Sequence, residues 1–148
     1  MSFSWAPFGR TYDEASQPLP ESAPPPPQPA PSPRSLRREP ARGLAIVTCM
    51  DCRIDPLAAV GLSLGDAVVL RNAGAQISDD VLRSLRMAQD ALGVRTVYVI
   101  AHTDCAAHDG DEDAAAAAAE DGGERVAALL PNVRVEVGLL DVATGSLR

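Results

Sequence analysis

The main evidence for the fold class is one stretch of sequence, Leu44-Ala45-Ile46-Val47-Thr48-Cys49-Met50-Asp51-Cys52-Arg53. Its first half is an apolar run, whereas its second half carries thiols, a carboxylate and a guanidinium. This change of character indicates a buried strand that opens into a loop. Ligands of open α/β sheets bind at the carboxyl ends of the strands, so we expect a functional site at this loop.

A second stretch has the same design. The nearly continuous apolar run Thr96–Ala101 is typical of a parallel strand buried on both faces, and His102-Thr103-Asp104-Cys105 follows it directly. If the two strands are parallel neighbours, Cys49, His102 and Cys105 converge at one edge of the sheet. Two cysteines and one histidine are the ligand set of a catalytic zinc that keeps its fourth position open. We therefore predict a Zn²⁺ site formed by these three side chains.

Two charged residues follow Cys49 at alternate positions. The carboxylate of Asp51 is placed to accept a hydrogen bond from water at the metal, and Arg53 is placed to hold Asp51 ionised as a bidentate partner. If Arg53 releases Asp51, that carboxylate becomes the predicted fourth metal ligand. The predicted catalytic residues are thus Asp51 and Arg53, and Asp51 is also a predicted ligand.

The spacing Cys49-x-x-Cys52 supports a different interpretation, a redox pair of the thioredoxin type. That interpretation leaves His102 and Cys105 without a role, so we favour the metal site and treat Cys52 as a small residue lining the loop. His108 is interpreted as an exposed loop histidine.

The remaining pattern predicts an α/β domain with a small, mostly parallel sheet flanked by helices. Helical spacing of apolar residues begins after Ser78, a predicted N-cap, and stops at Gly93. The alanine-rich segment 108–121 has little side-chain volume and predicts a poorly anchored helix, which residues 124–130 continue or restart. The expected strands span 44–48, 67–70, 96–101 and 133–142, with a short helical turn at 54–60 and a loop at 71–75.

Composition divides the chain of 148 residues into two parts. Residues 1–42 are rich in proline and are expected to form a disordered or polyproline II extension, and residues 43–148 form the domain. Phe3, Trp5, Phe8 and Tyr12 are expected either to be exposed on this arm or to pack on a partner subunit.

The net charge of −7 does not favour a nucleic-acid partner. No segment is long and apolar enough to cross a membrane and no signal peptide is apparent, so we expect a cytoplasmic protein.

Three motifs together resemble the β-class carbonic anhydrases, the shorter bacterial members above all. They are Cys49-x-Asp51-x-Arg53, Arg71-Asn72-Ala73-Gly74 and His102-Thr103-Asp104-Cys105, in the order and approximate spacing of that family. The resemblance implies a zinc lyase that interconverts carbon dioxide and bicarbonate, with Cys49, His102 and Cys105 as ligands and Asp51 with Arg53 as a catalytic dyad. It also implies a homodimer or higher homo-oligomer.

Two other functions are compatible with the same motifs. A hydrolase of carbonyl sulfide or carbon disulfide on this scaffold would share every ligand. The second alternative is a regulatory protein that binds zinc but is catalytically silent. It is considered because Ala106-Ala107 and the alanine run stand where many short members of the family have Gly-Met and a longer helical segment.

Overall fold

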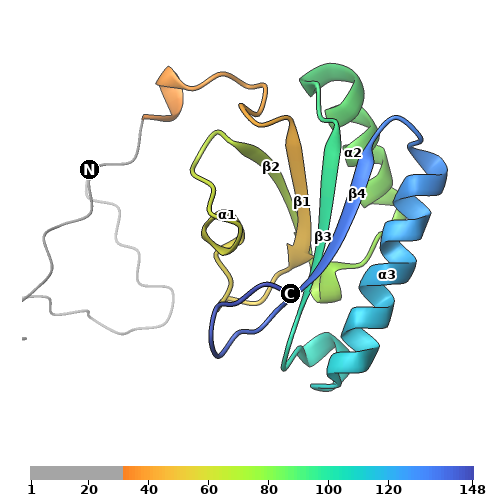
Figure 1. Ribbon diagram of the computed structural model, residues 1–148. Coiled ribbons are helices and arrows are strands. Elements are labelled where there is room, and N and C mark those ends of the chain that lie inside the picture. The colour runs from red at the N-terminus through yellow and green to blue at the C-terminus, as the bar shows by residue number, and fades with distance from the viewer. Residues whose placement is uncertain (1–31) are drawn as a thin grey trace, which may run out of the picture.

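The computed structural model describes residues 32–148 (Figure 1). Its strands are β1 (Leu44–Cys49), β2 (Ala67–Asn72), β3 (Thr96–His102) and β4 (Arg134–Leu140). Its α-helices are α1 (Pro56–Ala59), α2 (Asp79–Leu92) and α3 (Glu112–Leu129), and its short 3₁₀ turns are η1 (Pro33–Ser35), η2 (Ala73–Ala75) and η3 (Ala106–His108). The predicted alternation of strands and helices is confirmed.

The four strands form one sheet in the order β2-β1-β3-β4, and all neighbours are parallel. Leu44 of β1 pairs with Ala67 of β2 on one side and with Thr96 of β3 on the other. Because this register is maintained along β1, the carboxyl ends of β1 and β3 finish side by side. The loops after Cys49 and His102 therefore start at the same edge of the sheet.

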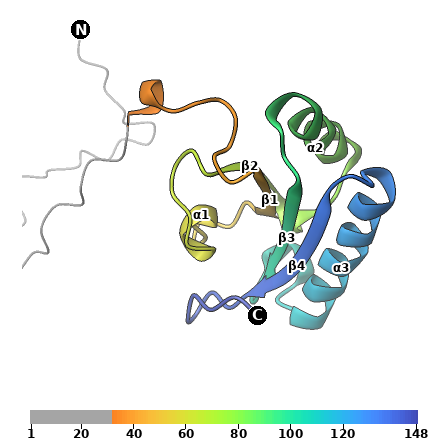
Figure 2. The same ribbon diagram turned by 45° about the horizontal axis from the view of Figure 1, so that its top comes forward.

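The two faces of the sheet are covered unequally. Helices α2 and α3 lie on one face, whereas the short α1 lies on the other (Figure 2). The main core fills the α2–α3 side, where Val47, Leu85, Val97, Val99 and Val126 are completely buried. A smaller apolar cluster on the α1 side includes Ile46, Ile54, Ile100 and Leu140, and it reaches Cys49 and Cys105.

Helix α2 begins and ends where the sequence predicts. The hydroxyl of Ser78 accepts a hydrogen bond from the backbone N–H of Val81, which satisfies one of the free donors of the first turn. Gly93 ends the helix in the left-handed conformation, with φ of 72°. The buried side chains of α2 are Val81, Leu85 and Ala88, which lie on the stripe expected to face the sheet.

Helix α3 corrects the prediction of a poorly anchored or interrupted helix. It is continuous over 18 residues, with Asp111 as its N-cap. Its buried positions are mostly small residues, namely Ala115, Ala119, Gly122, Gly123 and Val126. Small residues let the helix backbone lie close to the sheet, so low side-chain volume here produces close packing rather than weak anchoring.

Two predicted boundaries also differ from the structure. Arg71 and Asn72 were expected in a loop but belong to β2, because they pair with Thr48 and Cys49 of β1. Strand β4 ends at Leu140, whereas Asp141 and Val142 were expected to continue it. The Asp141 carboxylate accepts backbone N–H groups of the following turn, which bends the chain away from the sheet.

The predicted N-terminal extension is described only in part, since residues 1–31 and their four aromatic side chains lie outside the described residues. In the part that is described, the backbone N–H groups of Ala41 and Arg42 donate to the carbonyls of Gly65 and Asp66. Leu36 also lies against Gly65. The last residues before β1 therefore contact the segment that leads into β2.

Candidate metal centre

The side chains of Cys49, His102 and Cys105 lie together at the carboxyl ends of β1 and β3. One sulfur or ring-nitrogen atom from each lies within 4.8 Å of the others, and all three residues are buried. Cys49 and His102 are the last residues of their strands, and Cys105 follows in the loop after β3. The parallel register thus brings together side chains that are about fifty residues apart in the chain.

The two ring nitrogens of His102 differ in their hydrogen bonding within the described part of the chain. Nδ1 lies 2.8 Å from the carbonyl oxygen of Thr103, and since a carbonyl can only accept, the proton belongs on Nδ1. Nε2 therefore carries a lone pair, yet it is buried and has no hydrogen-bond partner among the described residues. A buried ring nitrogen without a partner is costly unless a cation or a proton donor occupies that position.

The two cysteines face each other across the cluster, with their sulfur atoms 3.9 Å apart. Burial raises the pKa of the Cys105 thiol, and the neighbouring Cys49 raises it further. The backbone N–H of Gly74 donates to the Cys49 sulfur at 3.3 Å. Two adjacent thiolates repel each other unless a cation lies between them, so this pair fits a divalent metal.

Asp51 and Arg53 form the ion pair that the sequence predicts. Arg53 donates from Nε to Asp51 Oδ1 at 3.0 Å and from a terminal nitrogen to Oδ2 at 2.7 Å. Hydrogen bonds from the Arg53 side chain and backbone hold the pKa of Asp51 well below its usual range. Oδ2 also lies 3.9 Å from His102 Nε2, so the ionised carboxylate is beside the cluster while it is bound to arginine.

Three residues without a predicted role complete the site. Arg71 donates to the backbone carbonyls of Cys49 and Asp51, and Gly74 donates to the Cys49 sulfur. Asp104 accepts a hydrogen bond from Arg53. Arg71 and Gly74 lie in one of the quoted motifs, so the motif gave a signal, but their partners depend on the pairing of β1 with β2. Asp104 also lies in a quoted motif, but its contact with Arg53 depends on the pairing of β1 with β3.

Cys52 does not join the cluster. It is exposed, and all three cysteines are free in the structure. Within residues 32–148, Cys49 is grouped with His102 and Cys105 instead. This grouping favours the metal-site interpretation over the redox pair.

A hollow of about 570 Å³ opens over the site. Residues 49–53 line one part of it, and Ala73, Ala106 and Ala107 give it an apolar side. Ala106 and Ala107 therefore line the space next to Cys49. The hollow thus combines an apolar side with the Asp51–Arg53 ion pair.

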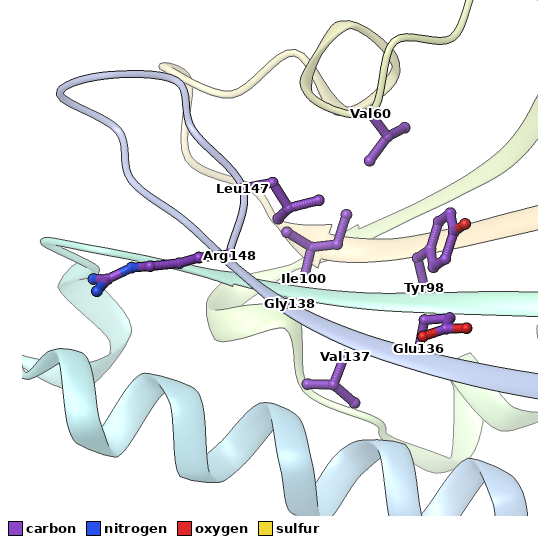
Figure 3. Close-up of a pocket in the computed structure, with 8 residues that line it drawn as sticks. All are labelled: Val60, Tyr98, Ile100, Glu136, Val137, Gly138, Leu147 and Arg148. Atoms are coloured by element: carbon purple, nitrogen blue, oxygen red, sulfur yellow. The ribbon is translucent and has the colours of Figure 1, made fainter.

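A second hollow of about 530 Å³ lies elsewhere, on the sheet face that carries α1. Figure 3 shows Val60 and Leu147 pointing toward Tyr98 and Ile100 of β3, whereas Val137 points to the helix side. None of the three clustered residues lines this second hollow. Of these two hollows, only the first is lined by a residue of the Cys49, His102 and Cys105 cluster.

Fold and site together define a class: a parallel α/β domain with a buried Cys-His-Cys group able to hold a metal at the strand ends. Comparisons with known proteins agree. The carbonic anhydrase family matches residues 44–139. The chain is 47% identical over 66 residues to Beta-carbonic anhydrase 1 of Mycobacterium tuberculosis, and 42% identical over 64 residues to a carbon disulfide hydrolase of Saccharolobus solfataricus.

These matches cover 45% and 43% of this chain, but only 40% and 31% of the two relatives. Among solved structures, a carbonic anhydrase from Streptococcus mutans superposes with a TM-score of 0.62 at 32% identity, covering 74% of this chain and 82% of that one. The chain belongs to the β-class of the carbonic anhydrase family.

Proposed function

We propose that this chain is a zinc-dependent lyase that catalyses the reversible hydration of carbon dioxide to bicarbonate. The observation that carries the proposal is the buried group of two thiols and one imidazole whose Nε2 has no partner, next to an arginine-bound carboxylate. Cys49, His102 and Cys105 would hold the zinc. When bound by such a set, zinc acts as a Lewis acid and lowers the pKa of water in its open position.

The residues around the cluster would perform three tasks. Asp51, kept ionised by Arg53, would accept a hydrogen bond and so orient the reacting water. The His102 Nδ1–H bond to Thr103 would fix the ring with Nε2 toward the metal. Ala73, Ala106 and Ala107 would give carbon dioxide an apolar surface and exclude competing water.

The test is metal content per chain measured together with stopped-flow hydration of carbon dioxide. We expect about one zinc per chain and saturable turnover. Asp51→Asn should keep the zinc and lose activity on the order of 100-fold, as is typical when a positioned acid–base group is removed. Zinc-loaded wild-type protein without turnover would instead support the silent regulatory protein.

The second candidate function is hydrolysis of carbon disulfide. It is supported by the 42% identity over 64 residues with the carbon disulfide hydrolase of Saccharolobus solfataricus. Both activities would use the same ligands. Initial rates with carbon dioxide, carbonyl sulfide and carbon disulfide on one metal-verified preparation separate them, because hydrolysis of the sulfur compounds releases hydrogen sulfide. The ratio of rates decides the substrate.

We further propose that residues 43–148 form the catalytic domain, that residues 1–42 are an extension, and that the protein is cytoplasmic and a homodimer or larger oligomer. The open face at Tyr98, Gly138 and Leu147 supports an oligomer, because it exposes apolar surface on a small domain. The grouping of Cys49 and Cys105 with His102 as candidate metal ligands, rather than as disulfide partners, supports a reducing compartment. Within the described part of the chain, no helix has the length and apolar character to span a bilayer. Light scattering of the purified chain tests the oligomer.

A further inference from the structure

Arg53 joins two carboxylates that come from different strand ends. Toward Asp51 it donates from Nε and one terminal nitrogen, at 3.0 Å and 2.7 Å. Toward Asp104 it donates from its other terminal nitrogen to Oδ2 at 2.8 Å, and the terminal nitrogen that binds Asp51 also donates to the Asp104 backbone carbonyl at 3.0 Å. Four different N–H groups serve these contacts, and a guanidinium has five, so the two residues do not compete for arginine.

The two carboxylates differ in their surroundings. The Asp51 side chain is 14% exposed and lies beside His102, whereas the Asp104 side chain is 73% exposed. Asp104 also has φ of 51°, a left-handed conformation that only glycine, asparagine and aspartate adopt readily. Its carbonyl and its carboxylate both contact the guanidinium.

We propose that Asp104 is a positioning residue that keeps Arg53 on Asp51 and thereby keeps Asp51 from becoming a metal ligand. Arginine has a long side chain with much rotational freedom, and the second anchor from the β3 loop restricts it. While Arg53 is held, both Asp51 oxygens are engaged. When Arg53 is released, the carboxylate 3.9 Å from His102 Nε2 is free to turn toward the metal position. This inference rests on the proposed metal centre.

The experiment measures anion binding rather than turnover. Protein loaded with Co²⁺ in place of zinc is titrated with thiocyanate and followed by its visible absorption. Asp104→Asn keeps the left-handed backbone and removes the charge. If Asp51 then occupies the metal more often, apparent thiocyanate affinity falls, by up to about fivefold for an exposed ion pair. Loss of a negative charge near the site would by itself raise anion affinity, so the direction separates the two effects.

Two further variants make the test specific. Asp109→Asn is the matched control, because Asp109 also has φ of 51° and makes no hydrogen bond to Arg53 in the described structure. It should leave thiocyanate affinity unchanged or slightly raised. In an Asp51→Ala background, Asp104→Asn should no longer lower the affinity, because no carboxylate remains to take the metal position.

The outcomes separate this inference from the proposed function. Unchanged or higher thiocyanate affinity in Asp104→Asn, with cobalt bound normally, overturns the role of Asp104 alone. A fall that persists in the Asp51→Ala background also overturns it, since Asp51 is then not involved. A chain that binds no cobalt at Cys49, His102 and Cys105 overturns the metal centre, and this inference with it.

Discussion

The close approach of helix α3 to the sheet can be tested at Gly123. A Cβ atom added there would lie 2.6 Å from Cγ2 of Val137 in β4 and 3.5 Å from Cγ1 of Val135. The first distance is far shorter than a van der Waals contact, and both valines are stiff at χ1. Gly123→Ala therefore forces either the helix or the strand to move.

The expected free-energy change has two opposing parts. Alanine is favoured over glycine in a helix by about 1 kcal/mol. Overpacking of a close contact costs about 1–3 kcal/mol. The net result should be a loss of about 0–2 kcal/mol in the free energy of unfolding.

The decisive assay is a double-mutant cycle measured by urea unfolding. Val137→Ala removes the methyl group that the new Cβ would meet, so Gly123→Ala in that background should stabilise the protein by about 1 kcal/mol. The coupling energy between the two positions should then be about 1–3 kcal/mol. Ala117→Gly, at an exposed position of the same helix, measures the propensity part alone. Additive effects at Gly123 and Val137 would refute the argument that the small residues of α3 are required by close packing.

Three further predictions follow from the fold and the site. Leu85→Ala should lower the free energy of unfolding by about 2–5 kcal/mol in urea titration, because the side chain is completely buried; a loss below about 1 kcal/mol would contradict its place in the core. Chelation of the metal should lower the urea midpoint of the wild-type protein, since a ligand at 100 times its Kd stabilises the folded state by about 2.7 kcal/mol, and Cys49→Ser should abolish the difference between chelated and metal-loaded samples. The backbone N–H groups of Ala143 and Thr144 lower the pKa of Asp141, so its stabilising effect is present above about pH 4 and is lost as pH falls through the lower folded pKa. The protection factors of the turn amides, which are exchange rates corrected for their intrinsic pH dependence, should therefore fall in acid for wild type, while Asp141→Asn should show the lower protection already at neutral pH.

The sequence by itself determined the architecture and the location of the site. Apolar runs that end in Cys49 and His102 specify buried parallel strands, because such strands are apolar on both faces and present ligands at their carboxyl ends. The helix from Ser78 to Gly93 was also predictable, since capping and helical spacing are local properties. The pairing of Arg53 with Asp51 could be expected because the two residues are near neighbours in the chain.

Tertiary structure alone decided the contacts between distant segments. The alanine-rich segment was predicted to be poorly anchored because its side chains are small. Its packing, however, depends on how closely the backbone at Gly122 and Gly123 approaches Ile77 and Val137, and this distance cannot be read from the sequence. Likewise, Arg53 has a second carboxylate partner only because β1 and β3 are neighbours. This pairing brings the Asp104 Oδ2 atom to 2.8 Å from a terminal nitrogen of Arg53. Spacing along the chain determines local conformation, but the distance between residues of different strands is fixed by the register of the sheet.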